Sequence, residues 1–348
     1  MKPARPIVAL AAFLAAACLH AQVANPDCPT TTGALYARIR TLGLDPQRIY
    51  HVRDASLDRP SLHLDFDDGT LAFTEDLCGR ITGAFFDGEG EIRLRPPNRA
   101  ERGSLALFTG MAILEEQFTS AYLRFNDDTA AALQPALTPE PAATEFAKQW
   151  AGNARSLAEF DALRLLVDFS HLLPASAPTP PERSFQPFLH AHLLGKKLGA
   201  FEVFSDASLP EPLWVGQSRV KNDAVFFDVW TSFAPGSNEK ASTSPPIDAA
   251  ITQFCIRASV QPPTKLQAAT DLTVRIRRGG QRTLLFELSR YLKIDAISAD
   301  GRAVDFIQNP AIEGTALQRK GNDLVAVVFS APLATGQEVK MHLSLIHI

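Results

Sequence analysis

Apolar and polar residues alternate along much of the chain, with the two-residue period of a strand that buries one face. In residues 61–66 the apolar side chains recur at every second position. The pair Asp68-Gly69 that follows is typical of a tight turn, and apolar residues resume at Leu71 and Phe73. This pattern predicts a half-buried hairpin.

A second hairpin is expected over residues 81–94, where Asp87-Gly88-Glu89-Gly90 separates two apolar runs. The same glycines do not form a phosphate-binding loop, because the third glycine of that motif is absent and both flanks have the pattern of strands. We therefore interpret them as a turn.

Two stretches change to the longer spacing of a helix. Residues 113–125 place Leu114, Phe118 and Tyr122 four positions apart, which predicts a helical segment. A short helix is also expected over residues 33–44.

A long amphipathic helix is expected from Thr138, the predicted cap, with Pro139 at the first helical position. Its apolar face consists of Phe146, Trp150, Leu157, Phe160 and Leu163. The helix should end before the proline-rich loop 174–181. Strands are then expected at 188–194, 201–204, 213–215 and 225–230.

The β pattern is clearest after residues 234–246, which are rich in proline, serine and glycine and predict a linker. The expected strands are 272–276, 284–286, 292–298, 303–307, 324–329 and 339–348, with turns at Gly279-Gly280 and Asp300-Gly301. Their spacing is typical of a sandwich.

These patterns predict a mostly β protein with some helices, of the α+β class, built from antiparallel sheets. We expect a β-rich domain over residues 22–134, and an α+β domain with the long amphipathic helix over 135–247. The last domain, 248–348, should be a β-sandwich or a saddle-like sheet. Pro135 and Pro139 mark the first boundary.

The amino terminus has the layout of a secretory signal. A positive segment, 1–5, precedes the apolar run 7–18, and small Ala21 provides a cleavage site before Gln22. Because a membrane-spanning helix needs about 20 apolar residues, we expect residues 1–21 to be removed. The mature chain should then be periplasmic or secreted and carry no transmembrane helix. Alternatively, residues 15–18 loosely resemble a lipoprotein box, which would anchor the chain through a lipid on Cys18.

Composition and cysteine content exclude several classes of protein. The content of 46% apolar and 21% charged residues is that of a folded chain, and a net charge of −4 gives no footprint for nucleic acid. Cys28, Cys78 and Cys255 are too few for a disulfide scaffold or a zinc ribbon. Two alternatives remain for them: one disulfide with one free thiol, or three buried thiols that act as small apolar side chains.

The sharpest candidate for a metal site is His190-Ala191-His192, since alternate residues of a strand can present two imidazoles on one face. Zinc needs a third protein ligand, and none recurs at ligand spacing. We therefore interpret the pair as a partly exposed strand face.

The acidic clusters do not match known ligand patterns. Residues 65–68 and 127–128 lack the spacing of a calcium loop, and we assign them to turns. Glu115 and Glu116 are expected to diverge on a solvated helix face. We assign no catalytic, cofactor-binding or metal-binding residue, because no His-Glu-x-x-His motif occurs.

Residues 271–276, 284–288 and 292–294, with Asp300-Gly301, resemble the amino-terminal β-domain of membrane-alanyl-aminopeptidase-type zinc metallopeptidases, the gluzincins. The turn at 331–338 is similar to the one before the last strands of that domain. Upstream, residues 62–74, 79–83 and 118–128 look similar to the leader of some exported bacterial proteins of this type. Neither the zinc motif nor the Gly-x-Met-Glu-Asn motif occurs, so no catalytic residue can be transferred.

The resemblance implies the non-catalytic amino-terminal part of an exported zinc peptidase, truncated before its catalytic domain. The expected partner is that downstream domain, which would hold the zinc and act on peptides. Residues 339–348 alternate up to the last residue, so we also expect the chain to stop within a strand that leaves an open sheet edge. The alternative function is a free-standing periplasmic or cell-surface β-rich binding protein.

Overall fold

The computed structural model describes residues 28–140, 143, 145–175, 186–221, 224–236, 248–262, 265–309 and 322–347. The expected leader and Cys18 lie outside these residues, as do most of the loop 174–181 and of the linker 234–246. The described part is mostly β and its sheets are antiparallel, which confirms the predicted fold class.

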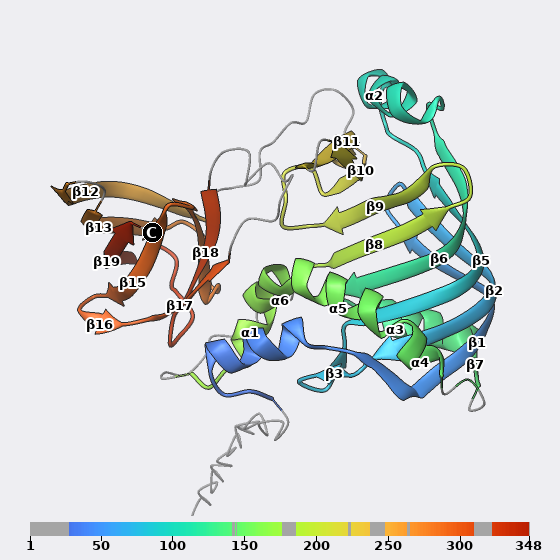
Figure 1. Ribbon diagram of the computed structural model, residues 1–348, viewed down its shortest axis with the longest axis horizontal. Helices are drawn as coiled ribbons and strands as arrows, with labels where there is room; N and C mark the ends of the chain where they lie inside the picture. Colours follow the sequence, from blue (N-terminus) through green and yellow to red (C-terminus); the bar gives the residue numbers. More distant parts are fainter. Residues whose placement is uncertain are drawn as a thin grey trace, which may run out of the picture.

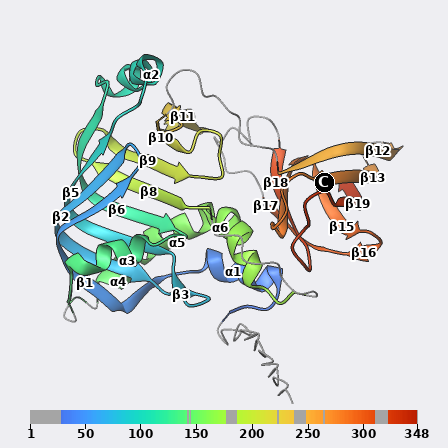
Figure 2. The same ribbon diagram turned by 180° about the vertical axis from the view of Figure 1, so that it is seen from behind.

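A nine-stranded sheet dominates the part before residue 248, here called the first domain (Figures 1 and 2). Its order is β11-β10-β9-β8-β6-β5-β2-β1-β7. The strands are β1 (Leu44–Arg59), β2 (Leu62–Thr74), β5 (Gly83–Leu94), β6 (Leu114–Phe125), β7 (Leu137–Pro139), β8 (Phe188–Gly195), β9 (Gly199–Asp206), β10 (Leu213–Lys221) and β11 (Ala224–Phe233). The short β3 (Asp76–Leu77) and β4 (Arg80–Ile81) pair separately. Because β6 pairs with β8, the boundary predicted at residue 135 does not separate two sheets.

The two predicted hairpin turns lie inside continuous strands, so both hairpin predictions were wrong. Asp68 and Gly69 belong to β2, and Gly88 and Gly90 belong to β5, which pairs with β2 along its length. A Cβ on Gly88 would lie 2.6 Å from the Cα of Gly69 and 2.3 Å from the carbonyl oxygen of Asp68. The glycines therefore allow the backbones of β2 and β5 to approach each other closely.

The helix predicted over 113–125 is strand β6, buried on both faces over its second half. Its apolar residues are four positions apart, a spacing that fits a strand as well as a helix. The long helix predicted from Thr138 is also wrong: Thr138 and Pro139 form the edge strand β7, which pairs with β1. Three short helices follow instead, α4 (Phe146–Gln149), α5 (Ala151–Phe160) and α6 (Ala162–Phe169).

The nine-stranded sheet buries both of its faces. One face forms a core of aromatic and aliphatic side chains that includes Phe66, Phe86 and Phe118. Helices α2 (Arg99–Thr109) and α3 (Thr129–Leu133) contribute Leu105 and Leu133 to it. Helices α4 and α5 cover part of the other face, and α6 and α1 (Thr32–Arg40) cover the rest.

The strands from Ala249 onward form two sheets of their own, here called the second domain. The five-stranded sheet has the order β12-β13-β19-β15-β16, and the three-stranded sheet has the order β14-β18-β17. The strands are β12 (Ala249–Gln261), β13 (Lys265–Ile276), β14 (Thr283–Ser289), β15 (Leu292–Ala299), β16 (Arg302–Ala303), β17 (Asp305–Asn309), β18 (Asn322–Val328) and β19 (Glu338–His347). One apolar core joins the two sheets.

Two turn predictions for this domain had different outcomes. The hairpin at Asp300-Gly301 is confirmed, since β15 pairs with β16 and both turn residues have positive φ. Gly279-Gly280 instead leads from β13 to β14, which belong to different sheets. The last strand, β19, lies between β13 and β15, so the prediction that it leaves an open edge was wrong.

The two domains meet through α1, α6 and the three-stranded sheet. Ala326 and Val328 belong to the same apolar cluster as α1 and α6. Arg282 is buried at this contact, and its guanidinium donates to five backbone carbonyls. The acceptors are Ser170, Leu173 and Pro174 of the first domain and Phe329 and Ser330 of the second.

Of the two possibilities left open for the cysteines, the disulfide is present. Cys28 is bonded to Cys78, which ties the segment before α1 to the β3–β4 turn, and Cys255 is free and exposed. No helix within the described ranges is long and apolar enough to cross a membrane.

Candidate docking surface

The two candidate histidines lie on β8 and both contact Glu202 of β9. His190 is buried, with Nδ1 at 2.8 Å from Asp161 Oδ2 and Nε2 at 2.9 Å from Glu202 Oε2. His192 is 38% exposed, with Nδ1 at 2.6 Å from Glu202 Oε1. The interpretation as a partly exposed strand face therefore holds for His192 and was wrong for His190.

Electrostatics keeps the centre of this network charged. Burial alone would lower the pKa of His190, but the charge of Asp161 and the hydrogen bonds to Asp161 and Glu202 outweigh it and raise the pKa to about 9. Burial likewise opposes the charged form of Glu202, yet hydrogen bonds from both histidines lower its pKa to about 2.

The network fastens helices to the sheet. Asp161 stands at the junction of α5 and α6, so its contact with His190 ties this junction to β8. Phe204 stacks on the imidazole of His190 with ring centroids 3.8 Å apart. Both ring nitrogens of His190 already face carboxylates, and no group of three metal-ligating side chains occurs in the described part of the chain.

The acidic residues that the sequence analysis assigned to turns or to a solvated face also have structural partners. Asp65 and Asp68 lie in β2 rather than in a turn, and Asp65 pairs with Arg93. Asp127 pairs with Arg59 and accepts a hydrogen bond from the backbone N–H of Thr129. Glu115 and Glu116 are on strand β6, where the buried Glu116 accepts backbone N–H groups from the β8–β9 turn, so a solvated helix face was wrong.

The most exposed apolar strand of the described chain is β12. Phe254, Ile256 and Val260 are 68%, 60% and 71% exposed. They lie opposite Leu272, Thr270 and Leu266 of β13. Because directly opposite residues in a sheet point to the same face, the three side chains share one face of β12.

That face continues the core side of the five-stranded sheet. Leu272 of β13 alternates with the buried Val274 and Ile276, and it packs against the second domain's core. The three apolar residues of β12 are thus on the core side, but the opposing sheet has only three strands and leaves them uncovered. We call Phe254, Ile256 and Val260 the β12 face.

The opposite side of β12 is polar, as in a strand with one buried side. Gln253, Cys255 and Arg257 alternate with the β12 face. Arg257 and His342 both contact Asp271 across the sheet. The alternation would bury the β12 face against another apolar surface, and in Figure 1 this strand points away from the first domain.

Comparisons with known proteins give matches among solved structures. The chain matches no protein-family model and no curated protein. Among solved structures it is similar to an M1 zinc metallopeptidase from Deinococcus radiodurans, at 17% identity and a TM-score of 0.24. It is also similar to a mutant two-domain M1 zinc metallopeptidase bound to L-tryptophan, at 19% identity and a TM-score of 0.23. Each match covers 29% of this chain and 20% of the other chain.

Proposed function

We propose that the chain is the non-catalytic amino-terminal part of an exported zinc-aminopeptidase-like protein. It packs through the β12 face against a catalytic domain encoded downstream and shapes access to that domain. The observation that carries the proposal is the exposure of Phe254, Ile256 and Val260 on the core side of a sheet. Large exposed apolar patches mark interaction sites in soluble proteins.

Burial of the β12 face would favour packing against another apolar surface. Fully burying an aliphatic or phenylalanine side chain contributes about 1.5–3 kcal/mol, and three such side chains lie along one strand. The gluzincin resemblance of residues 271–301 falls on β13, β14 and β15 of the same domain. The Cys28–Cys78 disulfide supports export, because disulfides persist in oxidising compartments.

The first test is the genomic reading frame beyond Ile348. A continuation with a His-Glu-x-x-His motif supports the proposal. A stop codon directly after Ile348, reproduced in an independent clone, contradicts it and favours the alternative of a free-standing binding protein.

The second test measures docking in the presence of the downstream domain, produced as a separate chain. Phe254→Lys with Ile256→Lys should weaken the complex at least tenfold in calorimetric titrations, because two charges would replace the apolar contact. Tyr291→Lys is the matched control, since Tyr291 is 63% exposed and lies outside β12. Unchanged affinity in the β12 variant would refute docking through this face.

A further inference from the structure

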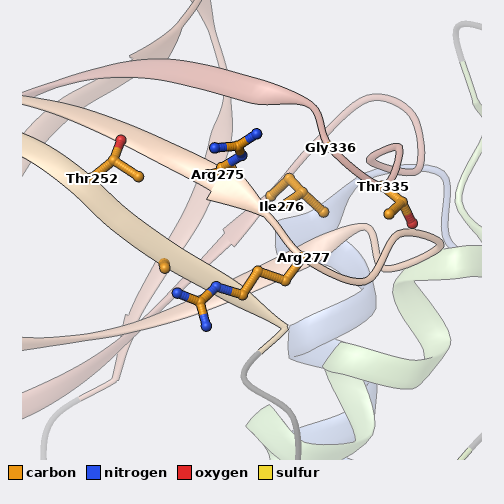
Figure 3. A pocket seen from close by; sticks show the side chains of 7 residues that line it. Thr252, Arg275, Ile276, Arg277, Thr335 and Gly336 are labelled. Atoms are coloured by element: carbon orange, nitrogen blue, oxygen red, sulfur yellow. The ribbon is translucent and has the colours of Figure 1, made fainter.

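The other side of β13 carries a pocket of about 430 Å³ at the end of the strand. Arg275, Ile276 and Arg277 form one wall, and Ala250 and Thr252 of β12 form the second. Thr335 and Gly336, from the turn before β19, close the end opposite Thr252 (Figure 3). None of the seven residues that line this pocket is acidic.

No ion pair among the described residues neutralises the positive charge of this pocket. Neither Arg275 nor Arg277 makes an ion pair with any residue of the described ranges, although Glu338 lies opposite Arg275 on β19. Asp248, whose backbone carbonyl accepts the N–H of Arg277, forms its ion pair with Arg278. Arg257 is likewise occupied by Asp271. The two pocket arginines therefore remain available to a ligand.

The backbone places Arg275 and Arg277 on the same face of β13, since they alternate with the buried Val274 and Ile276. Arg275 and Arg277 are two residues apart at the end of β13, a separation of about 7 Å along an extended chain. Ala250 lies opposite Arg275 and also lines the pocket. A bulge in β12 falls between Ile251 and Gln253 and re-aims Thr252 at the pocket.

The turn on the far side is fixed by hydrogen bonds. Thr335 Oγ1 accepts the backbone N–H of Gly279 at 2.8 Å, and the N–H of Gly336 donates to the carbonyl of Ile276 at 2.8 Å. Gly336 has a φ of 83°, which glycine adopts without strain. With its acceptor role taken, the Thr335 hydroxyl can still donate a hydrogen bond toward the pocket.

We propose that Arg275 and Arg277 form an oxyanion-binding site, which takes the carboxylate of a peptide or a phosphate group. Guanidinium forks match the geometry of both groups and donate paired hydrogen bonds to them. A bound oxyanion also reduces the repulsion between two cations that make no ion pair with the described residues. The site is separate from the β12 face, which lies on the opposite side of the same sheet.

The test is calorimetric titration of the chain with two probes, inorganic phosphate and N-acetyl-dialanine with a free carboxylate. At least one should bind with one-to-one stoichiometry, and its affinity should fall at least tenfold in both Arg275→Gln and Arg277→Gln. Arg302→Gln, which removes an exposed arginine from the edge strand β16 of the same sheet, should bind like the wild type. If only one probe binds, it shows whether the site takes a phosphate group or a carboxylate.

Three outcomes would overturn the site: no saturable binding of either probe, a loss confined to one of the two pocket variants, or an equal loss in Arg302→Gln. The Phe254→Lys and Ile256→Lys variant should retain binding of the probe. Failure of the oxyanion site and failure of docking through β12 are therefore distinguishable.

Discussion

At the scale of single residues, the charged form of His190 stabilises the first domain. Its pKa is raised to about 9, so its stabilising effect is complete below its unfolded pKa of about 6.5 and is lost as pH rises through 9. Removing one partner of a buried ion pair costs about 3–5 kcal/mol. We expect His190→Gln to destabilise the first domain by roughly this amount at pH 6.

Urea titrations followed by tryptophan fluorescence measure this effect, since Trp150, Trp214 and Trp230 all lie in the first domain. The wild-type midpoint should fall between pH 6 and pH 9, and the variant should lack that part of the fall. His342→Gln is the control, because its contact with Asp271 is exposed to solvent and should contribute little to stability. Equal pH dependence in wild type and His190→Gln would show that the imidazolium is not the stabilising form.

The sequence indicated the histidine pair but not its partner. Glu202 is ten positions beyond His192, too far for a local ligand pattern, yet the hairpin of β8 and β9 places them opposite each other. Strands had been expected at 188–194 and 201–204, so pairing them around residues 195–199 could have revealed Glu202. Asp161 could not have been found in this way, because it comes from the helix layer.

At the scale of elements, the glycines of β2 and β5 set how closely the two strands approach. Gly88→Ala should destabilise the first domain by about 1–3 kcal/mol, since the new methyl group would overlap with backbone atoms of β2. Gly103→Ala is the matched control, because nothing lies within 4 Å of a Cβ there and Gly103 is inside α2. It should stabilise the helix by up to about 1 kcal/mol.

Chemical denaturation of both variants measures the difference in the free energy of unfolding. A stable Gly88→Ala protein would mean that β2 and β5 can separate at this position without cost. Opposite signs for one substitution at two sites would confirm that close approach, rather than glycine's flexibility in the unfolded chain, determines the first effect.

The same strands show which sequence patterns were ambiguous. A four-residue apolar spacing is compatible with both a two-residue and a 3.6-residue period, so Leu114, Phe118 and Tyr122 could not distinguish β6 from a helix. An Asp-Gly pair is common in turns, but it does not by itself predict one. At Asp68-Gly69 the glycine lies where the backbones of β2 and β5 approach each other closely. Strands β14 and β15 of the second domain were better predicted, because each is short and lies next to a glycine turn, whereas no strand was predicted at β12.

At the scale of the whole molecule, Arg282 joins the two domains. Arg282→Met would leave carbonyls of both domains without a buried donor, at about 1–3 kcal/mol for each unsatisfied group. Since these acceptors span the contact, we expect the domains to unfold separately in the variant. Wild-type transitions followed by tryptophan fluorescence and by far-ultraviolet circular dichroism should coincide, and those of the variant should not.

Arg278→Met is the control for this experiment. Arg278 is on the same connection between β13 and β14, but its partner Asp248 is exposed on the second domain. Its two transitions should remain coincident. Coincident transitions in Arg282→Met would show that the apolar contact of α1 and α6 with β18 is sufficient to couple the domains.

The central position of β19 has a consequence for the order of folding. β13 and β15 are close in sequence, yet each must pair with a strand that is made after both. During synthesis the five-stranded sheet therefore cannot close until residues 338–347 have emerged. Until then the edges of β13 and β15 that face β19 remain unpaired, so the second domain is completed after the first.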